Sequence, residues 1–207
     1  IVNYANGLLR RIDTETVSAT DLENALRQIR DAAQRSKEII KHVRDFVNLS
    51  RPIIQRESVS SIITEVNQLL HGSIKRNNIG MGISIPFDDI GILANRIEIE
   101  QVIFNLLKNS IDSLISSKTR KPQINIKAKL SGKTTVVILI SDNGDGIDRD
   151  LADNIFNPYI TTKESGLGMG LSISRTIIEG HGGRLTLART GPAGACFRFT
   201  LTRADDA

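Results

Sequence analysis

The stretch RIEIEQVIFNLLKNSIDSL, residues 96–114, combines an apolar stripe with a polar one. Its isoleucine, valine and leucine residues recur every three or four positions, which predicts an amphipathic helix with one buried face. Gln101, Asn105 and Asn109 stand at i, i+4 and i+8 and share another face, and Asp112 follows one turn later. Amide and carboxylate groups in such a line predict a face directed at water or a charged ligand.

Three later segments carry polar and glycine residues in a fixed order. A predicted strand over 135–141 delivers Asp142 at its end, and Gly144 and Gly146 follow, where the backbone can come close to a flat ligand. The other two segments are Phe156-Asn157-Pro158-Tyr159 and the run from Thr161-Thr162-Lys163 to Gly166-Leu167-Gly168-Met169-Gly170-Leu171. Glycine amides at the start of a helix are suited to binding phosphate groups.

Helices and antiparallel strands are both predicted around these segments. In chain order we expect a helix over 58–74, strands over 83–86 and 92–94, the helix 96–114, strands over 123–130 and 135–141 joined by the turn 131–134, a helix over about 169–179, and a hairpin of 184–189 with 196–202. The strands do not alternate regularly with helices. We therefore expect an α+β sandwich, with helices on one face of a mixed, mostly antiparallel sheet.

The N-terminal part of the chain predicts a different architecture. Apolar residues follow a heptad seam over 21–50, namely Leu22, Leu26, Ile29, Ala33, Ile40, Val43 and Val47, and a second row widens the stripe. Thr20, Asp21 and Glu23 are start signals for this helix, and Pro52 ends it. A shorter helix over 1–12 and a loop over 13–20 complete a hairpin. So wide an apolar face predicts that two copies pair into a four-helix bundle.

Composition excludes several classes of protein. The 207 residues are 40% hydrophobic and 24% charged with a net charge of +4, as in a folded soluble protein without a membrane-embedded body. Aromatic residues are 4% with no tryptophan, which disfavours base stacking and hence nucleic-acid binding. A single cysteine, Cys196, excludes an internal disulfide and a thiolate metal site, and we expect a cytoplasmic location.

The four polar segments, in this order, resemble the nucleotide-binding boxes of sensor histidine kinases from two-component systems. Residues 101–112 are similar to the N box, 142–146 to the G1 box, 156–159 to the F box and 166–170 to the G2 box. The same ATPase superfamily includes DNA gyrase, MutL proteins and heat-shock chaperones. Residues 38–46 resemble the second helix of the kinases' dimerisation domain. The resemblance implies a truncated dimerisation hairpin over 1–52 and a catalytic ATP-binding domain over 53–207.

The resemblance also implies a role for individual residues. Asp142 would accept a hydrogen bond from the adenine amino group, and Gly144 and Gly146 would give the base room. Asn109 would bind Mg²⁺ through its side-chain oxygen. Asn105, Lys108 and the lid residue Lys163 would stand close to the phosphates as the catalytic set. The other implied nucleotide-binding residues are Asp112, Ile147, Phe156, Tyr159, Thr161, Thr162, Gly166, Leu167, Gly168, Met169, Gly170 and Leu171.

The expected reaction is transfer of the ATP γ-phosphate to a histidine, for relay to an aspartate of a response regulator. Hydrolysing members of the superfamily hold a glutamate base one turn before the magnesium asparagine. Here that position is Asn105, which cannot take a proton from water, so transfer is favoured over hydrolysis. The alternative is a non-catalytic ATP-binding and dimerisation module that switches a partner through nucleotide occupancy. Expected partners are ATP, a response regulator and a second copy of the chain, with no membrane contact.

None of the three histidines has the acidic neighbour expected after a phosphoacceptor. We expect His42 to be solvated, His71 to lie at a helix end and His181 to be structural. Residues 1–7 resemble the segment about ten residues beyond the acceptor in the family. The acceptor is therefore expected just before Ile1, in a longer protein of which this chain is a fragment.

Overall fold

The computed structural model describes residue 18, residues 20–30, residue 33, and residues 53–85, 90–163 and 168–204. The chain divides into two units, Ile1–Pro52 and Ile53–Ala207. In the first unit, residues 20–30 are helical. The expected helix over 1–12, the rest of the long helix and His42 lie outside the described residues, so the hairpin and its pairing stay predictions.

The helix of the first unit starts earlier than its sequence signals suggest. The hydroxyl of Ser18 accepts a hydrogen bond from the Asp21 amide at 3.1 Å and donates one to the Asp21 carboxylate at 2.9 Å. Ser18 therefore caps the helix, with Asp21 completing a reciprocal pair. Leu22 and Leu26, which belong to the heptad seam, are 40% and 54% exposed in the single chain.

The second unit is built on a five-stranded sheet in the order β2-β4-β5-β7-β6. Its strands are β2 (Gly80–Ser84), β4 (Gln123–Ser131), β5 (Thr135–Asp142), β6 (Leu185–Gly191) and β7 (Gly194–Thr202). β2 runs parallel to β4, and every other pairing is antiparallel. A separate antiparallel pair joins β1 (Gln55–Ser58) to β3 (Gly91–Ala94). The expected mixed, mostly antiparallel sheet is confirmed.

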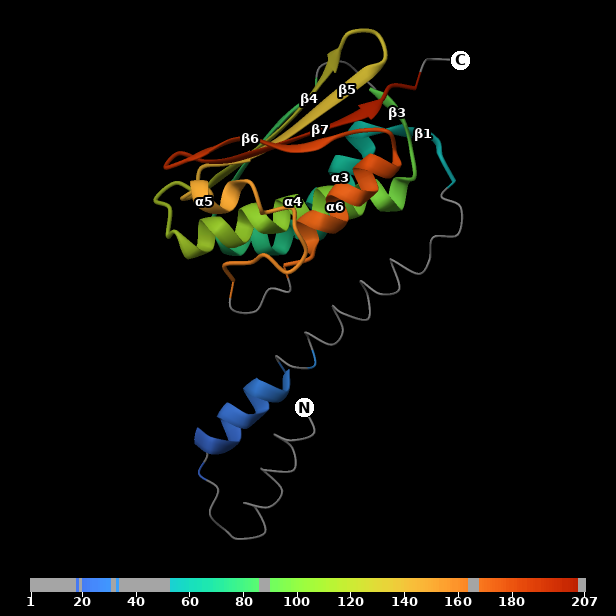
Figure 1. Ribbon diagram of the computed structural model, residues 1–207. Helices are drawn as coiled ribbons and strands as arrows, with labels where there is room; N and C mark the ends of the chain where they lie inside the picture. The colour runs from blue at the N-terminus through green and yellow to red at the C-terminus, as the bar shows by residue number, and fades with distance from the viewer. Residues whose placement is uncertain are drawn as a thin grey trace. The chain divides into compact units, whose positions relative to one another are not determined.

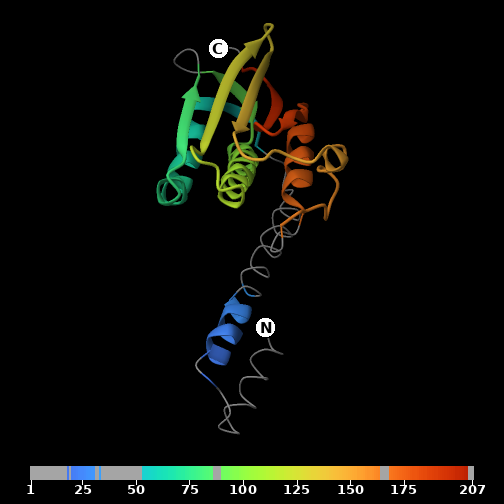
Figure 2. The ribbon, with the colours of Figure 1, turned by 90° about the vertical axis from the view of Figure 1, so that its left-hand side faces the viewer.

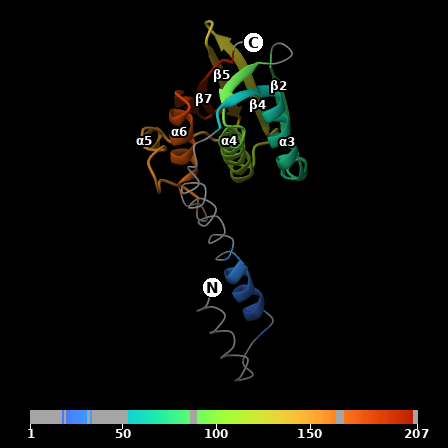
Figure 3. The same ribbon diagram turned by 90° about the vertical axis from the view of Figure 1, so that its right-hand side faces the viewer.

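Helices cover one face of this sheet (Figure 1). They are α3 (Val59–Arg76), α4 (Arg96–Ser116), α6 (Gly170–Gly180) and the single turn α5 (Arg149–Ala152). α4 lies between α3 and α6 (Figures 2 and 3), and it contacts both. The apolar stripe of α4, including Val102, Ile103 and Leu106, is fully buried against the inward side chains of the sheet. The expected α+β sandwich is confirmed.

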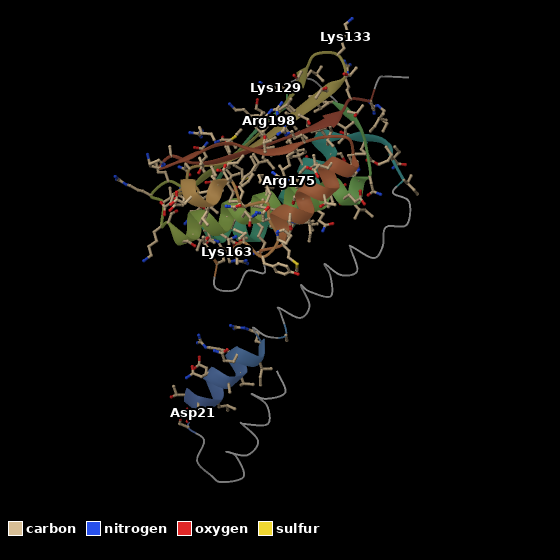
Figure 4. All side chains as sticks on the ribbon, in the orientation of Figure 1. Asp21, Lys129, Lys133, Lys163, Arg175 and Arg198 are labelled. Atoms are coloured by element: carbon tan, nitrogen blue, oxygen red, sulfur yellow. The ribbon has the colours of Figure 1, made fainter. Side chains whose placement is uncertain are left out.

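The opposite face of the sheet carries basic side chains. Lys129, Lys133 and Arg198 lie on this side, away from the helices (Figure 4). Lys127 and Lys129 alternate along β4 with the buried Ile126 and Ala128, as the two-residue period of a strand requires.

None of the helices that the structure describes combines the length and the hydropathy of a membrane-spanning segment.

Two predictions about local structure are wrong, and two elements were missed. The strand expected over 83–86 is β2 at 80–84, because two glycines hide its period. β1 and α5 were not predicted, since β1 is polar and α5 is too short to show a helical period. His71 is not at a helix end: α3 continues to Arg76, and His71 is exposed on its surface.

Three carboxylates surround one guanidinium at the start of α4. Arg96 contacts Glu57 at 3.0 Å, Glu65 at 2.6 Å and Glu100 at 2.9 Å. Burial raises the pKa of the Glu100 carboxyl above its ordinary value; Arg96 opposes this rise and the nearby Glu65 adds to it. The neutral form of Glu100 is therefore favoured in the folded chain more than in the unfolded chain.

This raised pKa predicts how stability responds to pH. Because the folded-state pKa of Glu100 exceeds the unfolded value of about 4.3, its contribution to stability is complete below that value and is lost as the pH rises through the folded-state pKa. Glu100→Gln, which cannot ionise, should lack this loss. We expect the difference in free energy of unfolding, variant minus wild type, to be more positive at pH 7.5 than at pH 4. Urea unfolding at both pH values measures it, and a difference that does not change with pH contradicts the prediction.

Candidate active site

The site is built around Asp142, the last residue of β5. Its carboxylate is buried, with 6% of the residue exposed, and accepts hydrogen bonds from three groups. Oδ2 accepts from the Ser110 hydroxyl of α4 at 3.1 Å, and Oδ1 accepts from the backbone N–H groups of Gly144 at 3.0 Å and Ala195 at 3.4 Å. These donors fix the carboxylate at the end of β5, the central strand, next to β7 and α4.

The loop after Asp142, residues 142–147, packs against the hairpin of β6 and β7. Gly146 has a φ of 77°, and a side chain there would collide with the carbonyl oxygen of Gly191. The Thr190 hydroxyl accepts from the Ile147 N–H at 2.7 Å and donates to the Ile147 carbonyl at 2.9 Å. Ile147 is partly buried against the core. Hydrogen bonds therefore hold both ends of the loop, the first residue Asp142 and the last residue Ile147.

The polar face of α4 contacts the ammonium group of Lys163. The Lys163 ammonium donates to the side-chain oxygen of Asn109 at 2.9 Å and to Asp112 Oδ2 at 2.8 Å. Lys108 approaches Asp112 Oδ1 at 3.5 Å. Figure 4 shows Lys163 beneath α4. An amide oxygen and a carboxylate that accept an ammonium together are the hard oxygen donors that Mg²⁺ prefers, so these residues fit a divalent cation.

The N-terminus of α6 faces this part of α4. Asn105 donates from its side-chain amide to the Gly170 carbonyl and to the Ser174 hydroxyl, each at 3.4 Å. Met169 occupies the N-cap position, and its side chain makes no capping hydrogen bond. The first backbone N–H groups of α6, beginning at Gly170 and Leu171, therefore have no side-chain cap, as an anion-binding helix start requires.

The two ends of the lid, the segment between Tyr159 and Gly168, are held together. The Tyr159 N–H donates to the Gly168 carbonyl at 3.1 Å, and both residues have a φ of 67°. Tyr159 is 75% exposed, and Thr161 and Thr162 are exposed as well. The Thr161 hydroxyl accepts from the Lys163 N–H at 3.1 Å. Gly166 and Leu167 lie outside the described residues.

Phe156, three residues before Tyr159, is part of the core. Its ring is 7% exposed and meets the Phe197 ring edge-on at a centroid distance of 6.3 Å. The Arg175 guanidinium of α6 stacks over it, 3.9 Å from the ring centroid. Phe156 thus anchors the start of the lid between the sheet and α6, and Leu171 packs against the same core.

Sequence reasoning overlooked several residues that shape the site. Ser110, Thr190, the Ala195 amide and Arg175 all contact residues that were expected to bind nucleotide. Ser110 stands three and four residues after Leu107 and Leu106, so a polar residue within the apolar stripe of the helix is the usable signal. Thr190 and Ala195 reach the site only because β7 pairs with β5, with Ser141 opposite Cys196. No pattern along the chain predicts that pairing.

A helix-backed mixed sheet with a buried aspartate at a strand end, a polar helix face and an uncapped helix start defines an ATPase domain of the histidine kinase type. Residues 94–205 match the family model described as "Histidine kinase-, DNA gyrase B-, and HSP90-like ATPase". This match covers more than half of the chain, and the chain belongs to that family.

Its curated relatives are named as sensor proteins and sensor histidine kinases. The chain is 34% identical over 208 residues to sensor protein FixL of Bradyrhizobium diazoefficiens, covering 100% of this chain and 41% of FixL. It is 31% identical over 201 residues to sensor protein TdiS of Thauera aromatica, covering 97% of this chain and 36% of TdiS. The resemblance to sensor histidine kinases is confirmed, and the chain spans about two fifths of the length of these relatives.

Solved structures agree with this family. The catalytic domain of histidine kinase ThkA has a TM-score of 0.65 and 30% identity, covering 72% of this chain and 95% of that one. ThkA in complex with the response regulator TrrA has a TM-score of 0.77 and 24% identity over 98% of this chain and 57% of that one, which shows likeness of fold.

Proposed function

We propose that this chain is the nucleotide-binding and phosphotransfer core of a sensor histidine kinase. It binds Mg-ATP in the site around Asp142, Asn109 and the start of α6, and transfers the γ-phosphate to a histidine of the first dimerisation helix. A response-regulator aspartate then receives the phosphate, and ThkA, a structural neighbour, has been crystallised with such a regulator. The contact between Lys163 and the Asn109–Asp112 pair is the observation that carries the proposal.

That contact brings together the groups expected around the triphosphate. Asn109 and Asp112 would hold Mg²⁺, which would neutralise phosphate charge. Lys163 would then leave the oxygens of these two residues and bind the β- and γ-phosphates. The uncapped amides at Gly170 and Leu171 supply further donors to phosphate oxygens.

The hydrogen bonds of Asn105 support transfer over hydrolysis. Its amide donates to Gly170 and Ser174, so the residue ties α4 to α6 and offers no proton-accepting group to water. In the transfer, the lone pair of an imidazole nitrogen forms a bond to the γ-phosphorus as the bond from phosphorus to the β–γ bridging oxygen breaks, and ADP leaves. Lys108 and Lys163 stabilise the charge on the phosphate oxygens.

Neither described histidine is suited to be the acceptor. His181 is 9% exposed, its Nε2 accepts the Asn95 N–H at 3.0 Å, and its Nδ1 lies 2.8 Å from the Ile177 carbonyl. The lone pair needed for attack is therefore already engaged, which supports a structural role for His181. His71 lies on the exposed surface of α3, outside the site. The acceptor therefore has to be supplied by another segment.

A transfer assay tests the proposal. The chain is incubated with Mg²⁺, γ-labelled ATP and a polypeptide that carries the first dimerisation helix with its histidine, and acid-labile label on that polypeptide is measured. We expect transfer by the wild type and at least a 100-fold lower rate for Asn109→Ala, because the magnesium ligand is lost. Gln68→Ala, which removes an amide from the exposed surface of α3, is the matched control and should transfer normally.

The outcomes separate the candidate functions. ATP binding without transfer by the wild type would favour the non-catalytic switching module. Steady phosphate release into water that disappears in Asn109→Ala would favour a hydrolysing ATPase. Either result contradicts the proposed kinase reaction.

A further inference from the structure

We propose that Thr190, at the end of β6, is a positioning residue that shapes the site for the adenine base of ATP. The inference rests on the proposed ATP-binding function. Thr190 lies 43 residues after Ile147 in sequence, yet its hydroxyl bonds both backbone groups of Ile147, the N–H at 2.7 Å and the carbonyl at 2.9 Å. Ile147 is the residue at which the base-binding loop ends.

One hydroxyl satisfies two backbone groups here because it donates and accepts at once. Serine and threonine are the small side chains that can do this. Both residues are only partly exposed, and an unpaired backbone group in such a place is costly. Without the hydroxyl, the Ile147 N–H and carbonyl would lose their hydrogen bonds to Thr190. The end of the loop at Ile147 would then be free to move.

The same hairpin holds the loop at two further points. The backbone of Gly191 lies directly against Gly146, so close that a methyl group on Gly146 would not fit. The Ala195 N–H donates to Asp142 Oδ1 at 3.4 Å. The end of the hairpin, residues 190–195, is thus a rigid template against which the loop 142–147 takes its shape.

Asp142 and Thr190 have different roles in this arrangement. Asp142 is the loop residue that would contact the base, whereas Thr190 bonds the backbone of Ile147, at the other end of the loop. Thr190 therefore acts through the loop and not by touching the nucleotide. Its removal should weaken recognition of the base more than recognition of the phosphates, which are bound by α4, the lid and α6.

The test compares Thr190→Val with Thr190→Ser. Valine keeps the shape and β-branching of threonine but has no hydroxyl, and serine keeps the hydroxyl. Binding of ATP and of inorganic tripolyphosphate, which has phosphates and no base, is measured with Mg²⁺ on the 207-residue chain, together with thermal unfolding. We expect Thr190→Val to raise the Kd for ATP about tenfold, the size of one lost buried hydrogen bond, with tripolyphosphate affinity unchanged. Thr190→Ser should restore ATP affinity.

Other outcomes overturn the inference in distinguishable ways. If the wild type binds ATP and Thr190→Val binds it equally well, Thr190 does not position the loop, and the proposed function stands. If Thr190→Val loses ATP and tripolyphosphate affinity to the same extent, with a lower Tm, its role is only structural. If the wild type does not bind ATP better than tripolyphosphate, the proposed function fails and this inference fails with it.

Discussion

Asp142→Asn is expected to raise the Kd for ATP about 100-fold while leaving the fold intact. Oδ1 of Asp142 accepts two backbone N–H groups, from Gly144 and Ala195. In the variant, the asparagine oxygen has to occupy the position of Oδ1, because only an oxygen can accept these two N–H groups. The asparagine NH₂ group therefore occupies the position of Oδ2. The Ser110 hydroxyl can turn and accept from it, but an adenine amino group would meet a donor where it needs an acceptor. Loss of a charge-assisted hydrogen bond of about 1.5–3 kcal/mol accounts for most of the effect.

Titration of a fluorescent ATP analogue into the variant and the wild type measures this change. Asp153→Asn is the matched control, because it removes the same charge from an exposed position after α5. It should bind ATP as the wild type does. Urea unfolding should place Asp142→Asn close to the wild type, since the amide keeps hydrogen bonds to Gly144, Ala195 and Ser110. Unchanged affinity in Asp142→Asn would refute the adenine contact assigned to Asp142.

The parts of this fold that could be predicted from sequence are those whose signal is local. α3 and α4 are long and amphipathic, and their stripes of buried isoleucine, leucine and valine repeat at the helical period. The polar face of α4 is visible in the same way. β2 was misplaced because Gly80 and Gly82 carry no side chain, so the strand shows no alternation in the region where it pairs with β4.

In the candidate site, too, only the local features could be predicted from the sequence. The grouping of Asn109 with Asp112 follows from helical spacing, but their contact with Lys163 joins residues 54 and 51 positions apart. The resemblance to histidine kinases implied only that Lys163 and Asn109 both stand near the phosphates, and spacing could not show even that. The support of the loop by Thr190 depends on the pairing of β6 with β7 and of β7 with β5, which is a tertiary feature. Thr190 looks like an ordinary strand residue in the sequence.

The lid stem yields the second large expected effect, from Gly168→Ala. Gly168 has a φ of 67°, and a methyl group there would lie 2.5 Å from the Tyr159 carbonyl carbon and 2.7 Å from the Ile160 nitrogen. Both are backbone atoms, so no side chain can turn aside, and the hydrogen bond from the Tyr159 N–H to the Gly168 carbonyl must break or shift. The lid then loses the closure that brings Lys163 to the polar face of α4. We expect at least a tenfold rise in the Kd for ATP, corresponding to about 1.4 kcal/mol or more.

Gly132→Ala separates this collision from the cost of backbone conformation alone. Gly132 has a φ of 69°, almost the same as Gly168, but it lies in the turn between β4 and β5 with no atom within 4 Å of an added methyl group. Both variants place alanine in the left-handed region, which costs about 1–2 kcal/mol. Gly132→Ala should show only that loss of stability and normal ATP binding. Because Tyr159, Thr161 and Thr162 are exposed, rearrangement of the lid stem should add little to this loss of stability. Gly168→Ala should therefore unfold close to Gly132→Ala, yet bind ATP far more weakly. Equal ATP affinity in the two variants would show that the lid stem does not control the site.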